Sequence, residues 1–180
     1  MRQCAPTAFY MVLSGAGYIP DAETLANLCV ALRDQNVFTD TYQKHNWSRP
    51  ALSAYLRHRY NAPIVSWQLH RPPPQNVEAM RQAGYINTDE EAKFFADEVE
   101  GHSIQYLAEQ GYPVIVTVKP NFAGMGNKSV HAIIILEWTD DKVTIIDPDG
   151  RNPRRTFTPP EILESISEGA AGTIILPKHA

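Results

Sequence analysis

Hydrophobic residues in the first part of the chain recur at the spacing of helices. The first apolar stretch begins near Pro6, because a missing backbone N–H is tolerated in the first turn of a helix, and it ends at the glycines after Ser14. A second helix is expected from a cap at Asp21 to about Asp34, and a third over about 49–60. The pattern therefore predicts a helical N-terminal region.

The middle of the chain combines strand and helix signals. The segment PIVSWQL (63–69) is rich in β-branched and aromatic residues and predicts a strand. The proline-rich run that follows (71–75) predicts a stiff, extended connector. Thr88 and Glu91 have the spacing of a capping box, which predicts a helix that continues to about Glu100.

Beyond about residue 104 the chain changes character. Short β-branched segments separated by turn residues predict a small antiparallel sheet, with strands at 112–118, 131–138, 142–149 and 172–177. A helical first half followed by a strand-rich second half predicts the α+β class. We expect one domain with a helical lobe of about 1–104, a sheet lobe of about 105–180, and a ligand-binding cleft between them.

Length and charge exclude several classes of function. With 180 residues, 43% hydrophobic residues and a net charge of −4, the chain is typical of one globular domain. It offers no electrostatic reason to bind nucleic acid or an anionic membrane, and no apolar run is long enough to insert into a membrane. Without a secretory signal we expect a cytoplasmic protein, or a secreted one if the chain begins after a removed segment.

The two cysteines lie in different surroundings. Cys29 is surrounded at helical spacing by Leu25, Leu28 and Leu32, so we expect it to be a small core hydrophobe. Cys4 directly precedes Ala-Pro and the first predicted helix. Because the N-terminus of a helix stabilises a thiolate and an adjacent oxyanion, Cys4 is the candidate nucleophile.

His131 and Asp147 are the candidate partners of Cys4. Of six histidines, His131 alone stands at the first position of a predicted strand, after a loop at 121–130 that we expect to be mobile. Asp147 ends the next predicted strand. Each residue alone is more often structural, but the order Cys, His, Asp is typical of cysteine hydrolases. There the histidine moves the proton and the third residue orients the ring.

The turn between these two strands decides whether Asp147 can reach His131. A two-residue turn that pairs Thr139 with Lys142 would place His131 opposite Gly150 and leave Asp147 on the other face of the sheet. A three-residue loop would place His131 opposite Asp149 and Asp147 on the same face, and a bulge elsewhere would restore the same parity. A catalytic Asp147 therefore predicts an odd loop or a bulge.

No metal or cofactor is expected from the sequence. The histidines lack the spacing of a zinc site. The stretch that starts at Asp147 begins like a calcium loop, but Asn152 stands where the loop needs glycine and Thr158 where it needs glutamate.

Three motifs resemble the bacteriocin-processing peptidases, the family that cleaves double-glycine leader peptides, and their stand-alone relatives in the papain-like clan. QCAPTAFYMVLSGAG is similar to the nucleophile helix, and GYPVIVTV with HAIIILEW and IDPDG is similar to the histidine and Asp-Pro strands. The resemblance covers Cys4 to about Gly150. It implies a papain-like two-lobed fold, with Cys4 as nucleophile, His131 as general base and acid, and Asp147 as the orienting residue.

The chain departs from the family pattern just before the nucleophile. The family's oxyanion-hole glutamine lies several residues before the cysteine, whereas here only three residues precede it, and Gln3 is adjacent. Either Gln3 serves in the oxyanion hole, or the corresponding glutamine lies upstream of this sequence.

The resemblance implies a thiol hydrolase that cleaves a peptide or related amide bond of a peptide or protein substrate, through a thioester intermediate. Two alternatives stay open. The same three residues could transfer the acyl group to an amine instead of water. A peptide-binding module that has kept the cleft and lost turnover is the third reading, favoured by the missing upstream glutamine.

Overall fold

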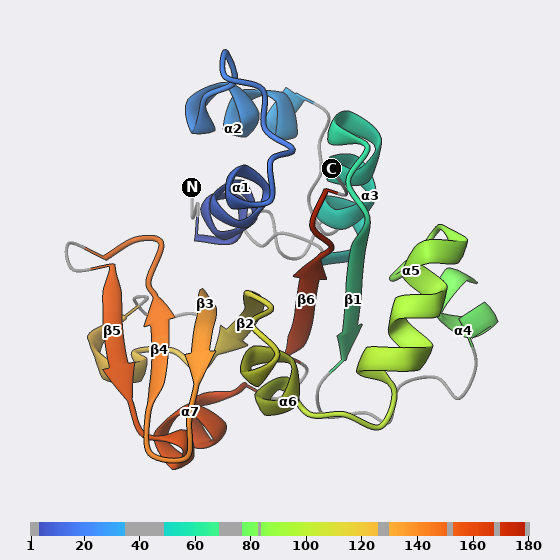
Figure 1. Cartoon of the computed structure of the whole chain (residues 1–180). Coiled ribbons are helices and arrows are strands. Elements are labelled where there is room, and N and C mark those ends of the chain that lie inside the picture. Colours follow the sequence, from blue (N-terminus) through green and yellow to red (C-terminus); the bar gives the residue numbers. More distant parts are fainter. Residues whose placement is uncertain are drawn as a thin grey trace.

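The computed structural model describes residues 4–34, 49–68, 77–82, 84–125, 130–150, 153–167 and 170–178. Figure 1 shows the helices and strands that these residues form. The helices are α1 (Cys4–Gly15), α2 (Leu25–Asp34), α3 (Arg49–Tyr60), α4 (Val77–Gln82), α5 (Asp89–Phe94), α6 (Ile104–Glu109) and α7 (Pro159–Ser165). The strands are β1 (Ile64–Gln68), β2 (Val114–Val118), β3 (His131–Trp138), β4 (Val143–Ile146), β5 (Arg154–Phe157) and β6 (Ala171–Ile175).

The strands form one antiparallel sheet in the order β1-β6-β2-β3-β4-β5. The last strand of the chain, β6, lies between β1 and β2, so the sheet joins a strand from the helical first half to the C-terminal strands (Figure 1). Helices and an antiparallel sheet in one chain confirm the predicted α+β class.

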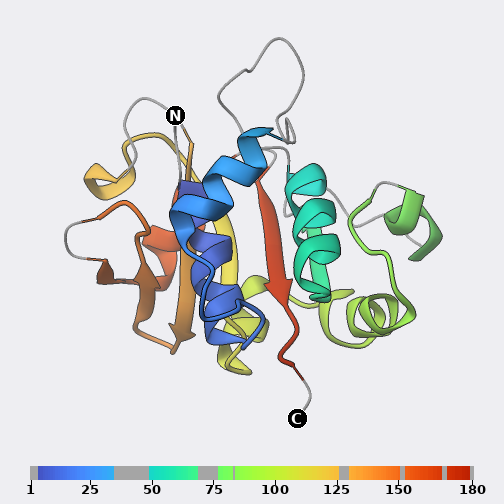
Figure 2. The ribbon, with the colours of Figure 1, turned by 90° about the horizontal axis from the view of Figure 1, so that it is seen from above.

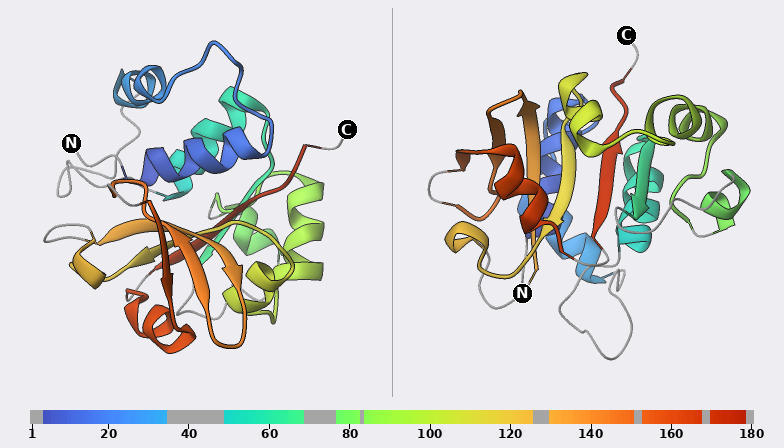
Figure 3. Two further views of the ribbon diagram at one scale, coloured as in Figure 1. Left: turned by 60° about the vertical axis from the view of Figure 1, so that its left-hand side comes forward. Right: turned by 90° about the horizontal axis from the view of Figure 1, so that it is seen from below.

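Helices cover both faces of the sheet, and each face has its own hydrophobic core. Side chains alternate along a strand, so Ile115 packs with α1, α2 and α3, whereas its neighbour Val116 packs with α5, α6 and α7. Figure 2 shows α1 and α2 over one face, and Figure 3 shows α6 and α7 on the opposite face.

Helix α1 is the element that brings Cys4 to the sheet. Its buried side chains include Ala8, Phe9 and Leu13, and the helix contacts β3. The helix ends where Gly17 adopts a left-handed φ of 81°, which lets the Tyr18 N–H donate to the Leu13 carbonyl at 2.9 Å. The predicted first helix and its glycine stop are therefore confirmed.

The β3–β4 hairpin has the predicted bulge. Its turn is the two-residue kind, in which the Thr139 N–H donates to the Lys142 carbonyl at 2.8 Å. The register then shifts between Ile135 and Glu137, so that Ile135 lies opposite Ile145. Without this shift, His131 and Asp147 would point to opposite faces of the sheet. With it, both side chains lie on the same face.

Several predicted elements are confirmed and others differ. The third helix has the predicted bounds, and the capping box of Thr88 and Glu91 is present at the start of α5, whose course continues as a π-helix to Val99. The proposed cap at Asp21 is wrong, because the Thr24 hydroxyl accepts from the Asn27 N–H at 3.2 Å and α2 begins only at Leu25. Strand β5 and the short helices α4, α6 and α7 were not predicted.

The prediction that Cys29 belongs to the core is also wrong. Leu28 and Leu32 are fully buried, but Cys29 is only half-buried. Helix α2 packs against α1 at the outside of the molecule, so its buried stripe is narrow (Figure 2).

The predicted mobile loop is described only in part, and residues 126–129 lie outside the described residues. Among the residues that are described, Met125 is buried and Phe122 packs against Phe157. The described part of this loop is therefore held by apolar contacts. Within the described part of the chain, no helix combines the length and the apolar character needed to cross a membrane.

Candidate active site

Cys4 is the first residue of α1, and it is buried at the sheet. Its relative exposure is 8%. The first N–H groups of a helix have no intrahelical carbonyl partner, and the helix dipole places partial positive charge there. Cys4 therefore lies where a negative charge on sulfur or on a neighbouring oxygen is stabilised.

His131 and Asp147 meet at the beginning of β3 and the end of β4. His131 Nε2 lies 2.7 Å from Asp147 Oδ1, and both side chains are buried. The Asp147 N–H donates to the Pro153 carbonyl at 2.6 Å, which fixes the backbone. Asp147 Oδ1 also accepts from the Asp149 N–H at 3.1 Å. The carboxylate is thus held from two directions while it bonds the ring.

The absence of a side chain at Gly150 leaves room for the Asp147 carboxylate. A Cβ atom at position 150 would lie 2.9 Å from Asp147 Oδ2 and 3.0 Å from its carboxyl carbon. Because real Cβ contacts are not that short, any larger residue would displace the carboxylate. Gly150 is required here by close approach and not by an unusual φ.

The second nitrogen of the His131 ring faces Cys4. Asp147 occupies Nε2, and a hydrogen bond joins the His131 side chain to the Cys4 thiol. Hydrogen bonds from the His131 side chain and from the Ala132 backbone both lower the pKa of the Cys4 thiol. The structure therefore brings Cys4, His131 and Asp147 together in one hydrogen-bonded chain.

The electrostatics of this chain favour the thiolate–imidazolium form. Burial alone would raise the pKa of Cys4, but the hydrogen bonds from His131 and Ala132 outweigh it, and the pKa is lowered. Burial would lower the pKa of His131, but its hydrogen bonds to Cys4 and Asp147 raise that pKa to about 9. A lowered thiol pKa beside a raised imidazole pKa is the condition for a nucleophilic cysteine at neutral pH.

Asp149 is a fourth group at this site, and it was not among the predicted site residues. Its carboxylate Oδ2 lies 3.9 Å from His131 Nδ1, and its side chain is 48% exposed. Asp149 could have been found from the register of the hairpin, because the register that brings Asp147 close to His131 also places Asp149 directly opposite His131.

Cys4, His131 and Asp149 offer sulfur, nitrogen and oxygen atoms within 4.8 Å of one another, a spacing that a metal ion could bridge. The hydrogen bonds among Cys4, His131, Asp147 and Ala132 already account for the placement of the thiol and the ring. The predicted oxyanion residue, Gln3, lies outside the described residues.

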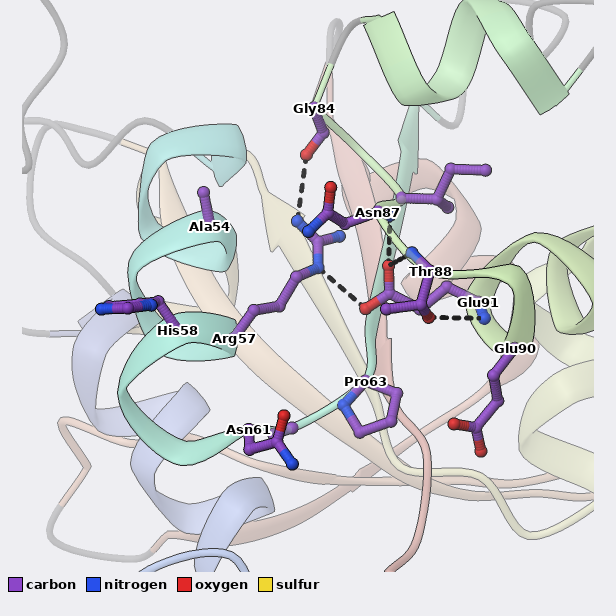
Figure 4. Close-up of a pocket in the computed structure, with 12 residues that line it drawn as sticks. Ala54, Arg57, His58, Asn61, Pro63, Gly84, Asn87, Thr88, Glu90 and Glu91 are labelled. Carbon is purple, nitrogen blue, oxygen red and sulfur yellow. Dashed lines mark hydrogen bonds and ion pairs between the residues drawn. The ribbon is translucent and has the colours of Figure 1, made fainter.

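A second polar cluster lines a pocket of about 440 Å³ between α3 and the segment that leads into α5 (Figure 4). Arg57 reaches across it to Glu91, with Nε 2.9 Å from Oε1, and both side chains are buried. Arg57 donates to the carbonyls of Ile64, Gly84 and Tyr85, and Glu91 accepts from the N–H groups of Ile64, Asn87 and Thr88. These bonds tie α3, β1 and α5 together.

Comparison with known proteins gives a family and a fold. The family model described as the peptidase C39-like family matches residues 2–161. A crystal structure of a Bacillus anthracis protein, provisionally assigned as a C39-like peptidase, is similar with a TM-score of 0.54 and 12% sequence identity. That similarity covers 99% of this chain and 90% of the other, and at this identity it concerns the fold alone. No curated protein matches the chain.

Proposed function

Because this chain belongs to the peptidase C39-like family, we propose that it is a cysteine peptidase-like hydrolase of peptide or related amide bonds. Cys4 is the nucleophile, His131 the general base and acid, and Asp147 the orienting residue. The observation that carries the proposal is the hydrogen-bonded chain of these three side chains at the start of α1. The lowered pKa of Cys4 supports the same assignment.

In the first half of the reaction, the Cys4 thiolate attacks the carbonyl carbon of the scissile amide and a C–S bond forms. The tetrahedral intermediate collapses when the C–N bond breaks, and His131 Nδ1 gives its proton to the departing amine. The products of this half are a free amine and a thioester on Cys4, with His131 neutral.

In the second half, a water molecule replaces the amine. Neutral His131 takes a proton from this water, whose oxygen attacks the thioester carbon. The C–S bond breaks, the carboxylic acid leaves, and the thiolate–imidazolium pair is restored. Throughout, Asp147 accepts from Nε2–H, so it holds the ring in the orientation that points Nδ1 at the sulfur.

The oxyanion that forms on the carbonyl oxygen needs hydrogen-bond donors. The backbone N–H groups at the start of α1 supply donors without intrahelical partners, next to the attacking sulfur. Gln3 is the proposed side-chain donor, because it is the glutamine that this sequence offers before Cys4 in place of the family's oxyanion-hole glutamine. The start of α1 thus serves both the thiolate and the oxyanion.

The experiment that tests this proposal is cleavage of a complex peptide library, with the products identified by mass spectrometry. The wild-type protein should generate new peptide termini, and Cys4→Ala should generate none, since the nucleophile is lost. Cys29→Ala is the matched control and should cleave normally. Addition of a primary amine distinguishes acyl transfer, because the products would then carry the amine.

Reaction with iodoacetamide separates an inactive binding module from an enzyme. If Cys4 reacts no faster than an ordinary thiol and no peptide is cleaved, the chain is a binding module and the proposal is wrong. Rapid alkylation of Cys4, compared with Cys29 in the same sample, is expected.

A further inference from the structure

Asp149 places a negative charge beside the atoms that react. Its Oδ2 is 3.9 Å from His131 Nδ1, and a carboxylate oxygen lies within 4.8 Å of the Cys4 sulfur. The backbone of Asp149 is anchored, because its N–H donates to Asp147 Oδ1 at 3.1 Å. The carboxylate is therefore positioned by the same turn that positions Asp147.

Within the pair itself, this charge works against the nucleophile. The negative charge of Asp149 raises the pKa of Cys4, opposing the hydrogen bonds that lower it. The role of orienting His131 is already filled by Asp147, which occupies Nε2 at 2.7 Å. Asp149 is instead 48% exposed, so its carboxylate is open to a group that enters the site.

The geometry also gives the side of the substrate that Asp149 would meet. This step rests on the proposed function. His131 Nδ1 delivers its proton to the departing amine, so the leaving half of the substrate must lie against Nδ1. The Asp149 carboxylate lies against the same nitrogen. A charged group just beyond the scissile bond would therefore lie on the same side of the His131 ring as the Asp149 carboxylate.

We propose that Asp149 is a specificity-determining residue that selects substrates with positive charge on the leaving-group side of the scissile bond. A lysine or arginine side chain there, or a free amino group, would neutralise the carboxylate and remove its unfavourable effect on the Cys4 thiolate. An acidic group at the same position would be repelled. The substrate class is thus a peptide or amide whose departing amine carries a cation.

Two thiosulfonate reagents of opposite charge test this proposal without a known substrate. The trimethylammonium-ethyl and the sulfonato-ethyl methanethiosulfonates each transfer an alkylthio group to a thiolate and release methanesulfinate. Their rates at Cys4 are measured by mass spectrometry at low ionic strength and normalised to the rates at Cys29. We expect the cationic reagent to be preferred, and Asp149→Asn to reduce the ratio of the two rates about tenfold.

The matched control is Asp140→Asn, which removes the same charge from the turn at the other end of the β3–β4 hairpin. It should leave the ratio unchanged, and high salt should weaken the preference of the wild type. A ratio that does not change in Asp149→Asn overturns the proposal. The outcome is independent of the peptidase assignment, because that assignment fails only if neutral iodoacetamide shows no activated thiol at Cys4 and no peptide is cleaved.

In the peptide-library experiment, the proposal predicts lysine and arginine directly after the cleaved bond in wild-type products. Among the bonds that Asp149→Asn cleaves, this preference should be lost. Cleavage by the wild type with no preference for cationic residues at that position would contradict the proposal while leaving the hydrolase intact.

Discussion

Two buried clusters of charged side chains in this fold are built in opposite ways. In the pocket between α3 and α5, Arg57 and Glu91 bond each other and the surrounding backbone carbonyls and N–H groups. At the start of α1, a hydrogen bond from His131 lowers the pKa of Cys4, and the exposed carboxylate of Asp149 lies beside the ring. The first cluster has fixed partners, whereas the second has a proton that can move.

This difference shows that buried charge alone does not identify a functional site. The Arg57–Glu91 pair lines a pocket, yet its hydrogen bonds join α3, β1 and the segment before α5, so its role is to hold those elements together (Figure 4). In the Cys4–His131 pair, by contrast, the pKa of the thiol is lowered and the pKa of the imidazole is raised. These shifts favour the transfer of the proton from sulfur to the ring. Reactivity follows from the exchangeable proton.

The largest effect expected from this comparison is on stability, at Glu91. Glu91→Gln would place an amide NH₂ against Arg57 or against the backbone N–H groups, leaving buried donors without an acceptor. We expect the free energy of unfolding to fall by about 3–5 kcal/mol, measured by urea denaturation. In the variant that remains folded, Cys4 should still alkylate at the wild-type rate.

Glu90→Gln is the matched control, because Glu90 is the exposed neighbour in the same helix and the change is chemically identical. Its effect should stay within about 0.5 kcal/mol. Equal destabilisation by the two variants would mean that the Arg57–Glu91 pair does not brace the fold.

The second effect is on reactivity, at His131. His131→Ala removes the donor that lowers the pKa of Cys4 and leaves burial, which raises it. Iodoacetamide should then react with Cys4 about ten- to a hundredfold more slowly at neutral pH, while Cys29 is unaffected. In the wild type, hydrolysis should appear as pH rises through the lowered Cys4 pKa and disappear as His131 loses its proton near pH 9. An unchanged alkylation rate in His131→Ala would remove His131 from the mechanism.

The third effect is at Gly150, where a methyl group tests the placement of the Asp147 carboxylate. Gly150→Ala adds a Cβ 2.9 Å from Asp147 Oδ2, so the carboxylate that bonds His131 must shift. We expect a loss of about 1–3 kcal/mol in stability. If Gly150 has only a structural role, the substitution should change stability alone. If it positions Asp147, the pH at which Cys4 becomes reactive toward iodoacetamide should also rise.

Gly15→Ala serves as the control for this substitution, because a Cβ at position 15 would meet nothing within 4 Å. It should change neither the stability by more than about 1 kcal/mol nor the pH profile. The Asp147 placement would be of no consequence if both glycine variants gave the wild-type profile.

The same hairpin shows how far the sequence could predict the site. The order of Cys4, His131 and Asp147, with strand geometry, required an odd loop or a bulge, and the structure has the bulge. The position of the bulge could not be predicted, because every residue from Ala132 to Leu136 is apolar. Without an alternation of polar and apolar residues, a one-residue shift in register cannot be recognised in the sequence.

The elements that the sequence did not predict share a physical reason. Helices α6 and α7 span six and seven residues, too short for a hydrophobic period to be visible. Strand β5 has the sequence RRTF and follows Pro153, so it lacks the apolar alternation of the other strands. It is stabilised by pairing with β4 at the edge of the sheet, a contact that only the folded chain provides.

The smallest effect is expected at Cys29, which sharpens the contrast between the two cysteines. Cys29 is half-buried and burial raises its pKa, so it should react with iodoacetamide no faster than a free thiol. Cys29→Ala should cost less than about 1 kcal/mol, because Cys29 is only partly buried and the change to alanine removes a single sulfur atom. Leu28→Ala, one position earlier and fully buried, should cost about 2–5 kcal/mol in the same urea experiment. If the two variants proved equally destabilising, the buried stripe of α2 would extend to Cys29, and the core position predicted from the leucine spacing would be right after all.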